Sequence, residues 1–229
     1  MITPRRRRGF EHLDDPGTSA ALRERSLRDV RLANVLLGGT NAVLSELRRI
    51  MPGMGVDFSL LDVGTGLADI PIRARQLAES KAVRMTTFSV DQAECLARSA
   101  AQVLDGSTCG DARCLPFADA SVDVVICSQV LHHFEDAELE VVLAELHRVA
   151  RRAVIVSDLR RSWFAAVGFW FVAWPMGFHA VTRHDGATSV LRGFTGGELA
   201  AHVRRSTGRA ALVRRHLGFR LTATWNPNA

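Results

Sequence analysis

The sequence predicts an α/β fold in which a mostly parallel, doubly wound sheet carries helices on both faces. Apolar runs of strand length alternate with segments of helical periodicity, and the first of these runs ends in a glycine-bearing turn. The chain has 229 residues and is 47% hydrophobic, which is enough for one sizeable core. We therefore expect a single α/β domain with additions at both ends.

The first part of the chain precedes the predicted sheet. Residues 1–17 include Arg5 to Arg8, and we expect a disordered basic segment rather than a secretory signal, because acidic and polar residues follow the arginines. Residues 18–53 contain two helical patterns. The first pattern ends at Gly38-Gly39, and the second begins near Thr40, a suitable N-cap residue.

The first strand runs into the turn of residues 60–69, Leu-Leu-Asp-Val-Gly-Thr-Gly-Leu-Ala-Asp. Glycine lets a backbone approach a ligand closely, and the following helix begins with unpaired amide N–H groups. This junction is typical of sites for nucleoside-containing cofactors, although the same turn can simply connect a strand to a helix.

Three further strands follow at the intervals of an α/β sheet. Val83 to Val90 is followed by Asp91, whose carboxylate can accept hydrogen bonds from both hydroxyls of a ribose. Ser121 to Ser128 contains a continuous apolar strand, and Ala153 to Val156 forms another, which ends at Asp158. Parallel strands place such residues along one edge of the sheet.

The C-terminal region continues the pattern. Thr195 and Glu198 have the spacing of a capping box at the start of a helix that runs to about Arg205. Residues from Ala210 to Trp225 alternate enough to form the last, antiparallel strands. We expect little functional content in this tail.

Together these motifs resemble class I S-adenosylmethionine-dependent methyltransferases, and in particular the branch of quinone-biosynthesis and secondary-metabolite small-molecule methyltransferases. The matching residues are Asp62-Val63-Gly64-Thr65-Gly66, Asp91, Gly110-Asp111-Ala112, Leu115-Pro116-Phe117 and Leu131-His132-His133. The resemblance implies a Rossmann-like, seven-stranded sheet and S-adenosyl-L-methionine as cofactor. It also implies a methyltransferase domain over residues 54–229, with the helices of residues 18–53 as a cap over the cofactor or as cover for a sheet edge.

Position by position, the resemblance implies which residues bind the cofactor. The methionine part would lie against Asp62, Gly64 and Gly66, the ribose would be held by Asp91 with Gln92 in the same site, the adenine would meet Asp111 and Ala112, and Ser128 would lie beside the sulfonium and its methyl group. The third glycine of the family's turn is Ala68 here, which removes one conformational freedom from the turn.

Methyl transfer to a hydroxyl requires a base that removes the proton of the acceptor. The chain contains no tyrosine, which leaves histidines and carboxylates as candidates. His132 closes the strand of residues 121–128 and Asp158 ends the strand that begins at Ala153, so an imidazole oriented by a carboxylate is plausible there. This pair matches a dyad found in some sugar O-methyltransferases. The adjacent His133 is an alternative, as is a histidine that only packs at a strand end.

We expect no metal ion, because neither Asp136 nor Asp158 has an asparagine nearby in the sequence. The four cysteines, Cys95, Cys109, Cys114 and Cys127, lack the paired spacing of zinc or disulfide frameworks. We therefore expect reduced, inert thiols in a cytoplasmic protein.

Residues from about 160 to 192 form an insertion after the strand that ends at Asp158. No Asp, Glu, Lys or Arg lies between Arg161 and Arg183, and seven aromatic residues do. The segment is long enough for a membrane span, but Pro175 and Gly177 interrupt it. We interpret it as an aromatic lid over a hydrophobic acceptor. Peripheral membrane contact and the interface of a homodimer are the alternatives.

The formal net charge of +5 does not by itself indicate a nucleic-acid partner. Almost every cation is an arginine, with Lys81 the only lysine, and no motif for gripping a flipped base is present. We therefore expect a small-molecule partner and no nucleic acid.

The sequence thus predicts methylation at oxygen or carbon of a small hydrophobic acceptor that is phenolic, quinone-like or polyketide-derived, in secondary metabolism. One alternative is a nicotinamide-dependent Rossmann oxidoreductase. It is disfavoured because residues 110–117 have no role there and the turn lacks its third glycine. The other alternative is a catalytically silent cofactor-binding protein.

Overall fold

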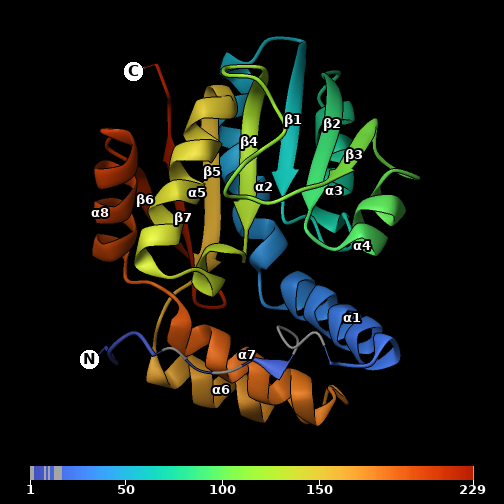
Figure 1. Ribbon diagram of the computed structural model, residues 1–229, viewed down its shortest axis with the longest axis vertical. Helices are drawn as coiled ribbons and strands as arrows, with labels where there is room; N and C mark the ends of the chain where they lie inside the picture. The colour runs from blue at the N-terminus through green and yellow to red at the C-terminus, as the bar shows by residue number, and fades with distance from the viewer. Residues whose placement is uncertain (1–2, 8, 10, 13–16, 229) are drawn as a thin grey trace.

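The computed structural model describes residues 3–7, 9, 11–12 and 17–228 (Figure 1). Its centre is one seven-stranded sheet with the order β3-β2-β1-β4-β5-β7-β6. The strands are β1 Asp57–Val63, β2 Arg84–Asp91, β3 Gly106–Cys109, β4 Val122–Ser128, β5 Ala150–Leu159, β6 Leu212–His216 and β7 Arg220–Trp225. The strands β1 to β5 are parallel, and β7 runs antiparallel to β5 and β6. This arrangement confirms the predicted mostly parallel α/β sheet.

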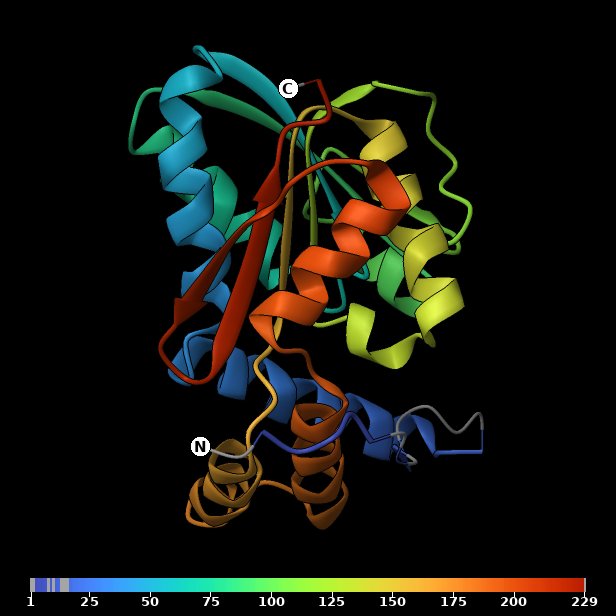
Figure 2. The same cartoon turned by 90° about the vertical axis from the view of Figure 1, so that its left-hand side faces the viewer.

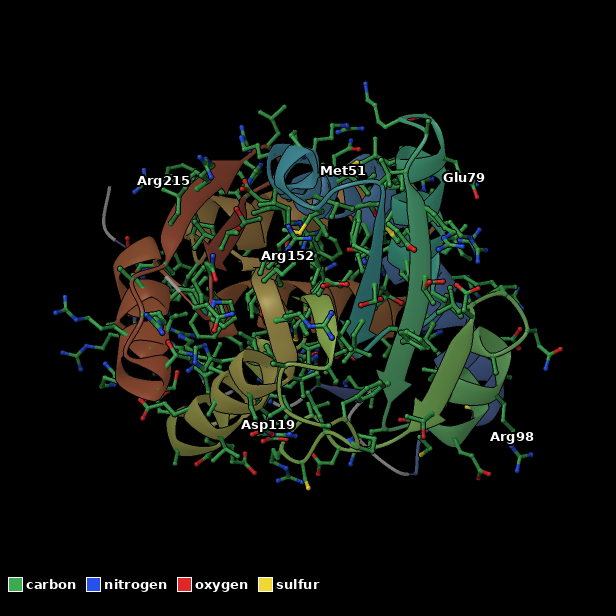
Figure 3. The ribbon with its side chains drawn as sticks, turned by 90° about the horizontal axis from the view of Figure 1, so that it is seen from above. Met51, Glu79, Arg98, Asp119, Arg152 and Arg215 are labelled. Carbon is green, nitrogen blue, oxygen red and sulfur yellow. The ribbon has the colours of Figure 1, made fainter. Side chains whose placement is uncertain are left out.

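Helices cover both faces of the sheet, as Figure 3 shows from above. The helices are α1 Ala20–Leu36, α2 Gly39–Ile50, α3 Asp69–Glu79, α4 Glu94–Ala100, α5 Asp136–Val149, α6 Trp163–Ala173, α7 Ala180–Arg192 and α8 Gly196–Thr207, with short 3-10 turns η2 Met51–Gly53 and η3 Leu131–His133. The helices α2 and α3 pack on one face, and α5 and α8 pack on the other.

The central strand β4 is covered by helices on both of its faces, which explains its continuous apolar run. Val124 and Ile126 belong to the core beneath α2 and α3, whereas Val125 and Cys127 belong to the core beneath α5 and α8. All four side chains are fully buried. A strand covered on both faces has no solvent side, so its sequence does not alternate.

Two helix starts were predicted from capping residues, with different outcomes. The capping box of α8 is confirmed, because the Thr195 hydroxyl accepts the Glu198 N–H and the Glu198 carboxylate accepts the Thr195 N–H. The N-cap near Thr40 is wrong. Gly38, with a φ of 78°, is the N-cap of α2, and the Thr40 hydroxyl instead donates to Asp69 on α3.

The amino ends of the parallel strands are closed by Arg152, which lies close to Met51 in Figure 3. Arg152, on β5, donates hydrogen bonds to the carbonyl of Met54 at 2.7 Å and to the carbonyl of Gly53. These bonds tie the start of β5 to the turn after α2.

The carboxyl ends of the parallel strands face α1, α6 and α7 (Figures 1 and 2). The helices α6 and α7 form a pair that corresponds to the predicted insertion, and α7 packs against η3. None of the helices in the described part of the chain combines the length and hydrophobicity needed to cross a bilayer.

The described residues of the N-terminal segment differ from the predicted disordered stretch. Arg6 donates to the Asp136 carboxylate at 2.6 Å and to the Arg192 carbonyl at 2.8 Å, and the carbonyl of Pro4 accepts a bond from Arg161. The segment therefore lies across the ends of α5 and α7. Arg5 and Arg7 are exposed, as expected for solvated cations, and Arg8 lies outside the described residues.

Candidate functional site

A cavity of about 490 Å³ lies at the carboxyl ends of β1, β4 and β5, beneath α1, α6 and α7. Its volume is within the range of small-molecule sites. One part of its lining comes from the β1–α3 turn and the end of β4, and these residues include Asp62, Gly64, Gly66 and Ser128. The rest is largely apolar and includes Phe164, Phe169, Val172 and Val190.

The β1–α3 turn depends on its two glycines. Gly64 has a φ of 74°, and a methyl group in its place would lie 2.3 Å from the Cγ2 atom of Val130. Gly66 has a φ of 55°, and a Cβ atom there would meet no other atom within 4 Å. At both positions the backbone is left-handed, a conformation that glycine adopts without strain. The space beside Gly66 is open. Ala68 adopts the same left-handed region, with a φ of 56°, as the N-cap of α3.

Asp62 carries an unpaired carboxylate oxygen at this turn. Its Oδ2 accepts the Thr65 hydroxyl at 2.8 Å, whereas its buried Oδ1 has no hydrogen-bond partner among the described residues. Burial raises the pKa of Asp62 to about 7, and the charges of Asp69 and Asp91 act in the same direction. The Ser128 hydroxyl is a second buried group without a partner in the described part of the chain. Two unpaired polar groups beside a cavity fit a polar ligand.

Asp91 supports the same turn from the end of β2. Its carboxylate accepts the N–H of Gly66 at 2.8 Å and the N–H of Ala93 at 2.9 Å. Burial raises the pKa of Asp91, although both backbone hydrogen bonds lower it. Each carboxylate oxygen retains acceptor capacity, so Asp91 can hold a ribose hydroxyl while it fixes the turn. Asp91 itself is not part of the cavity lining.

The residues assigned to the adenine lie beyond the cavity, at the neighbouring strand ends. Asp111 is paired with Arg113 at 2.6 Å, and that hydrogen bond keeps the pKa of Asp111 below its usual range. Gln92 is exposed and Ala112 is partly buried, and neither lines the cavity. The Gly110 N–H donates to the Asp91 carbonyl, which places this group beside the ribose position. The structure thus brings the methionine-side residues into the cavity lining and leaves the adenine-side residues outside it.

His132 and Asp158 form a buried pair, although His132 lies in the turn η3 after β4 and not at the strand end, as was predicted; Asp158 lies near the end of β5. The His132 Nδ1 atom lies 2.7 Å from Asp158 Oδ1, and the His132 backbone N–H donates to Oδ2 at 3.1 Å. Burial alone would raise the pKa of Asp158, but His132 and the Leu159 N–H outweigh it and hold this pKa below its ordinary value. His132 also lines the cavity. With Nδ1–H donated to the carboxylate, Nε2 carries the lone pair that can accept a proton.

His133, the alternative base, lies beside this pair but in a different environment. Its ring centroid lies 4.3 Å from that of His132, and its Nδ1 lies 4.0 Å from the carboxylate of Glu11. Glu11 is buried and paired with Arg192 at 2.7 Å. His133 is exposed, and the 4.0 Å between its Nδ1 and Glu11 exceeds the 2.7 Å between the Nδ1 of His132 and Asp158. The geometry therefore favours His132.

Two groups of described residues offer ligand atoms close enough together for a metal ion. The first is Glu11, His132 and His133, and the second is His12, His184 and Asp185; in each the atoms lie within 4.8 Å of one another. In the first group the Glu11 carboxylate already pairs with Arg192 and the His132 Nδ1 with Asp158. That methyl transfer needs no metal stays a prediction.

The structure reveals cavity residues that the sequence did not indicate. Gln129 follows Ser128; its amide donates to Asn34 on α1 at 2.5 Å and accepts from Arg220 on β7 at 2.6 Å. Burial lowers the pKa of Arg220 to about 10. All three line the cavity and link the cap to the sheet. The C-terminal tail thus contributes to the site, contrary to the prediction of little functional content. The only sequence signal for this group was Arg220, an arginine at the start of an otherwise uncharged strand.

The four cysteines are free, and Cys127 alone among them is buried. Burial raises the pKa of the Cys127 thiol well above its ordinary value, and the charges of Asp158 and Asp62 add to this effect. A thiol held protonated in the core is a poor nucleophile, which agrees with the prediction of an inert residue.

Comparison with known proteins relates this geometry to a reaction class. A family model described as a methyltransferase domain matches residues 61–156, which include the end of β1, the glycine turn, β4 and the His132 region. A search of curated proteins found no match. The family match therefore rests on the same segment that builds the cavity floor.

Solved structures of similar fold include several methyltransferases. The magnesium protoporphyrin IX methyltransferase of Synechocystis PCC 6803 with bound SAH has a TM-score of 0.56 at 16% identity, over 93% of this chain and 90% of that chain. A SAM-dependent methyltransferase of Thermotoga maritima, titled as a possible histamine N-methyltransferase, has a TM-score of 0.61 at 16% identity, over 91% and 100%. The CMeT domain of the citrinin polyketide synthase has a TM-score of 0.54 at 12% identity, over 73% and 46%. At these identities the similarity concerns the fold.

Proposed function

We propose that this protein, a class I methyltransferase that uses S-adenosyl-L-methionine, methylates an oxygen or carbon atom of a small hydrophobic acceptor. One observation carries the proposal. The buried His132–Asp158 pair lies on the same cavity as the glycine turn and as the apolar side chains of α6 and α7. A base, a cofactor site and an apolar acceptor site therefore meet in one enclosed space.

The residues at the β1–α3 turn fit the cofactor. Asp62 Oδ1 is a buried acceptor that lacks a partner among the described residues, and the ammonium group of the methionine part supplies donors of the right charge. Gly66 leaves room for the backbone to approach the ligand. When bound, the cofactor supplies an electrophilic methyl group on a sulfonium that is ready to leave.

The His132–Asp158 pair prepares the acceptor. His132 Nε2 takes the proton of an acceptor hydroxyl, and the Asp158 carboxylate stabilises the imidazolium that forms. The freed electron pair would then be available to a methyl donor held at the β1–α3 turn, and the imidazolium would return its proton to water. Loss of a ring hydroxyl proton also raises the electron density on the adjacent ring carbons, so the same base serves methylation at oxygen or at carbon.

The cavity lining supports an aromatic or otherwise apolar acceptor. Phe164, Phe169 and Val172 of α6 and Val190 of α7 face this space, and Thr182, on α7, is its buried polar neighbour. Such a lining fits phenolic, quinone-like or polyketide-derived acceptors, with few polar groups to fix their orientation. The polyketide synthase domain of similar fold supports the inclusion of polyketide-derived acceptors, and we place the activity in secondary metabolism.

A transfer assay tests this proposal. The purified protein is incubated with methyl-labelled S-adenosyl-L-methionine and a panel of phenols, hydroquinones and aromatic polyketides, and the labelled products are identified by mass spectrometry. We expect label in at least one hydrophobic acceptor and its loss with His132→Ala. Label in none of the three classes, from protein that binds the cofactor, would contradict the proposed acceptor class.

A further inference from the structure

The helix α6 has two unlike apolar faces. Its inner face, with Ala165, Gly168 and Phe169, lines the cavity. Its outer face carries Trp163, Val167, Trp170, Phe171 and Trp174, which are between 41% and 69% exposed. These five positions follow the spacing i, i+4, i+7, i+8 and i+11, so they form one continuous stripe along the helix. Figures 1 and 2 place α6 at the end of the molecule, outside the sheet and its covering helices.

Two arginines, Arg7 and Arg183, lie against aromatic rings of this outer face. Residues 160–192 contain four arginines and a single acidic residue, Asp185, which is buried. The guanidinium carbon of Arg7 lies 4.9 Å from the centre of the Trp163 ring, and that of Arg183 lies 6.0 Å from the centre of the Trp170 ring. The outer face of α6 is thus an aromatic stripe with a cationic rim.

We propose that the outer face of α6 binds the surface of an anionic lipid bilayer. Tryptophan and phenylalanine side chains enter the interface between headgroups and acyl chains, and arginines at the rim meet the negative headgroups. The helix itself has no charged residue that would have to enter the bilayer. A second copy of the chain fits this face less well, because a symmetric dimer would bring the two cationic rims together.

Because one helix carries both faces, membrane binding places the cavity next to the bilayer. The inner side chains of α6 are part of the acceptor site, so a lipophilic acceptor could pass from the bilayer into the cavity past this helix. This second step rests on the proposed function. Bilayer binding itself does not, and it can be measured without any acceptor.

Vesicle flotation with the full-length protein tests the proposal. The protein is mixed with vesicles of phosphatidylcholine alone or of phosphatidylcholine with phosphatidylglycerol, and the bound fraction is measured against lipid concentration. We expect binding that is at least about fivefold tighter to the vesicles with phosphatidylglycerol, since each arginine near an anionic surface contributes about this factor. No binding to the anionic vesicles would overturn the proposal, as would equal binding to both kinds of vesicle.

Two sets of variants locate the contact. Phe171→Ser with Trp174→Ser removes two stripe residues that do not line the cavity, and we expect at least about tenfold weaker binding. Arg183→Gln should weaken binding to anionic vesicles about fivefold. Val56→Ser is the matched control, because Val56 is 76% exposed at the start of β1, at the other end of the molecule. Wild-type affinity in the double variant would overturn the proposal.

A measurement on the wild-type protein keeps the test valid if the double variant does not fold. Three of the four tryptophans, Trp163, Trp170 and Trp174, lie on the outer face, whereas Trp225 is buried in the core. Vesicles with brominated acyl chains should therefore quench tryptophan emission. Unquenched emission would overturn the proposal, because the outer-face tryptophans would then not reach the bilayer. A dimer in light scattering that excludes vesicle binding would overturn it as well and would show that a second chain covers this face.

Discussion

Replacing Asp62 by asparagine should stabilise the protein in the absence of cofactor and weaken its binding of the cofactor. The reason is the buried Oδ1 atom, which has no hydrogen-bond partner among the residues described. Burial raises the pKa of Asp62 from 3.8 to about 7, so the ionised carboxylate is less stable in the folded chain than in the unfolded one. Asparagine has nearly the same shape and carries no charge.

The size of the effect follows from the two pKa values. Between pH 4 and pH 7 the unfolded chain releases this proton before the folded protein does. The free energy of unfolding therefore falls as the pH rises, by about 1.4 kcal/mol per pH unit. The Asp62 carboxylate therefore lowers the free energy of unfolding of the wild-type protein by roughly 4 kcal/mol at pH 8 and by roughly 1.5 kcal/mol at pH 5. Asparagine does not titrate, so its benefit at pH 8 should exceed that at pH 5 by about 2–3 kcal/mol.

Thermal unfolding of both proteins at pH 5 and pH 8 measures this difference. For a chain of this size 1 kcal/mol corresponds to roughly 2–4 °C in Tm, so the gap between variant and wild type should widen by about 5–10 °C. Asp105→Asn is the control, and it should lower the free energy of unfolding rather than raise it. The reason is that a hydrogen bond from the Thr87 N–H holds the pKa of Asp105 below its usual range. A gap for Asp62→Asn that is the same at both pH values would refute the reasoning.

The same carboxylate should make cofactor affinity depend on pH. Only ionised Asp62 pairs with the ammonium group, and with a pKa of about 7 the ionised fraction rises about eightfold from pH 6 to pH 7.5. Calorimetry with S-adenosylhomocysteine should show a comparable rise in wild-type affinity. Asp62→Asn should bind more weakly at both pH values and lack this rise, and a wild-type affinity that is constant over this range would contradict the role of Asp62.

Two further substitutions test the base and the turn. His132→Ala should lower the turnover number at least about tenfold, because general-base catalysis contributes about 10²- to 10⁴-fold, and should leave cofactor affinity unchanged. The exposed neighbour provides the control His133→Ala, and near-normal turnover of His132→Ala would remove the proposed base. Gly64→Ala should lose roughly 2–5 kcal/mol in urea unfolding, from left-handed strain and the clash with Val130. Gly208→Ala, with a φ of 72° and open space, should lose only about 1–2 kcal/mol, and equal losses would exclude the clash.

The sequence predicted the elements whose pattern is dictated by burial. The strand β4 reads as a continuous apolar run because both of its faces are covered, and α8 begins where its capping box predicts. The strand β3 was not predicted. It has four residues, Gly106–Cys109, lies at the edge of the sheet and has no fully buried side chain, so its sequence carries no apolar signal.

The candidate site was predictable where local backbone geometry restricts the residue type. The glycines at positions 64 and 66 have positive φ values, and the pair of His132 and Asp158 follows from the meeting of two adjacent strand ends. The network of Asn34, Gln129 and Arg220 was not predictable. Its members come from α1, the residue after β4 and the start of β7, and their spacing does not indicate that they meet.

The insertion contains one feature that the sequence predicted and one that it did not. The absence of charge and the aromatic content predicted an apolar cover, and α6 provides it. The polar stretch from Thr182 to Gly186 lies within α7, where Thr182, Asp185 and Gly186 line the cavity, but the partners of its side chains were not predicted. There the Thr182 hydroxyl contacts Ser26 at 3.1 Å and Asp29 at 3.0 Å, both on α1. Periodicity cannot identify such partners, because they depend on how α1 docks.

Binding of S-adenosylhomocysteine tests the central claim most directly, because it requires no acceptor. In calorimetry at pH 7.5 the purified protein should bind this compound at one site per chain, and NAD under the same conditions should give no binding signal. Folded protein that releases or takes up no heat with S-adenosylhomocysteine, and is not stabilised by it against thermal unfolding, would contradict the account of the cavity.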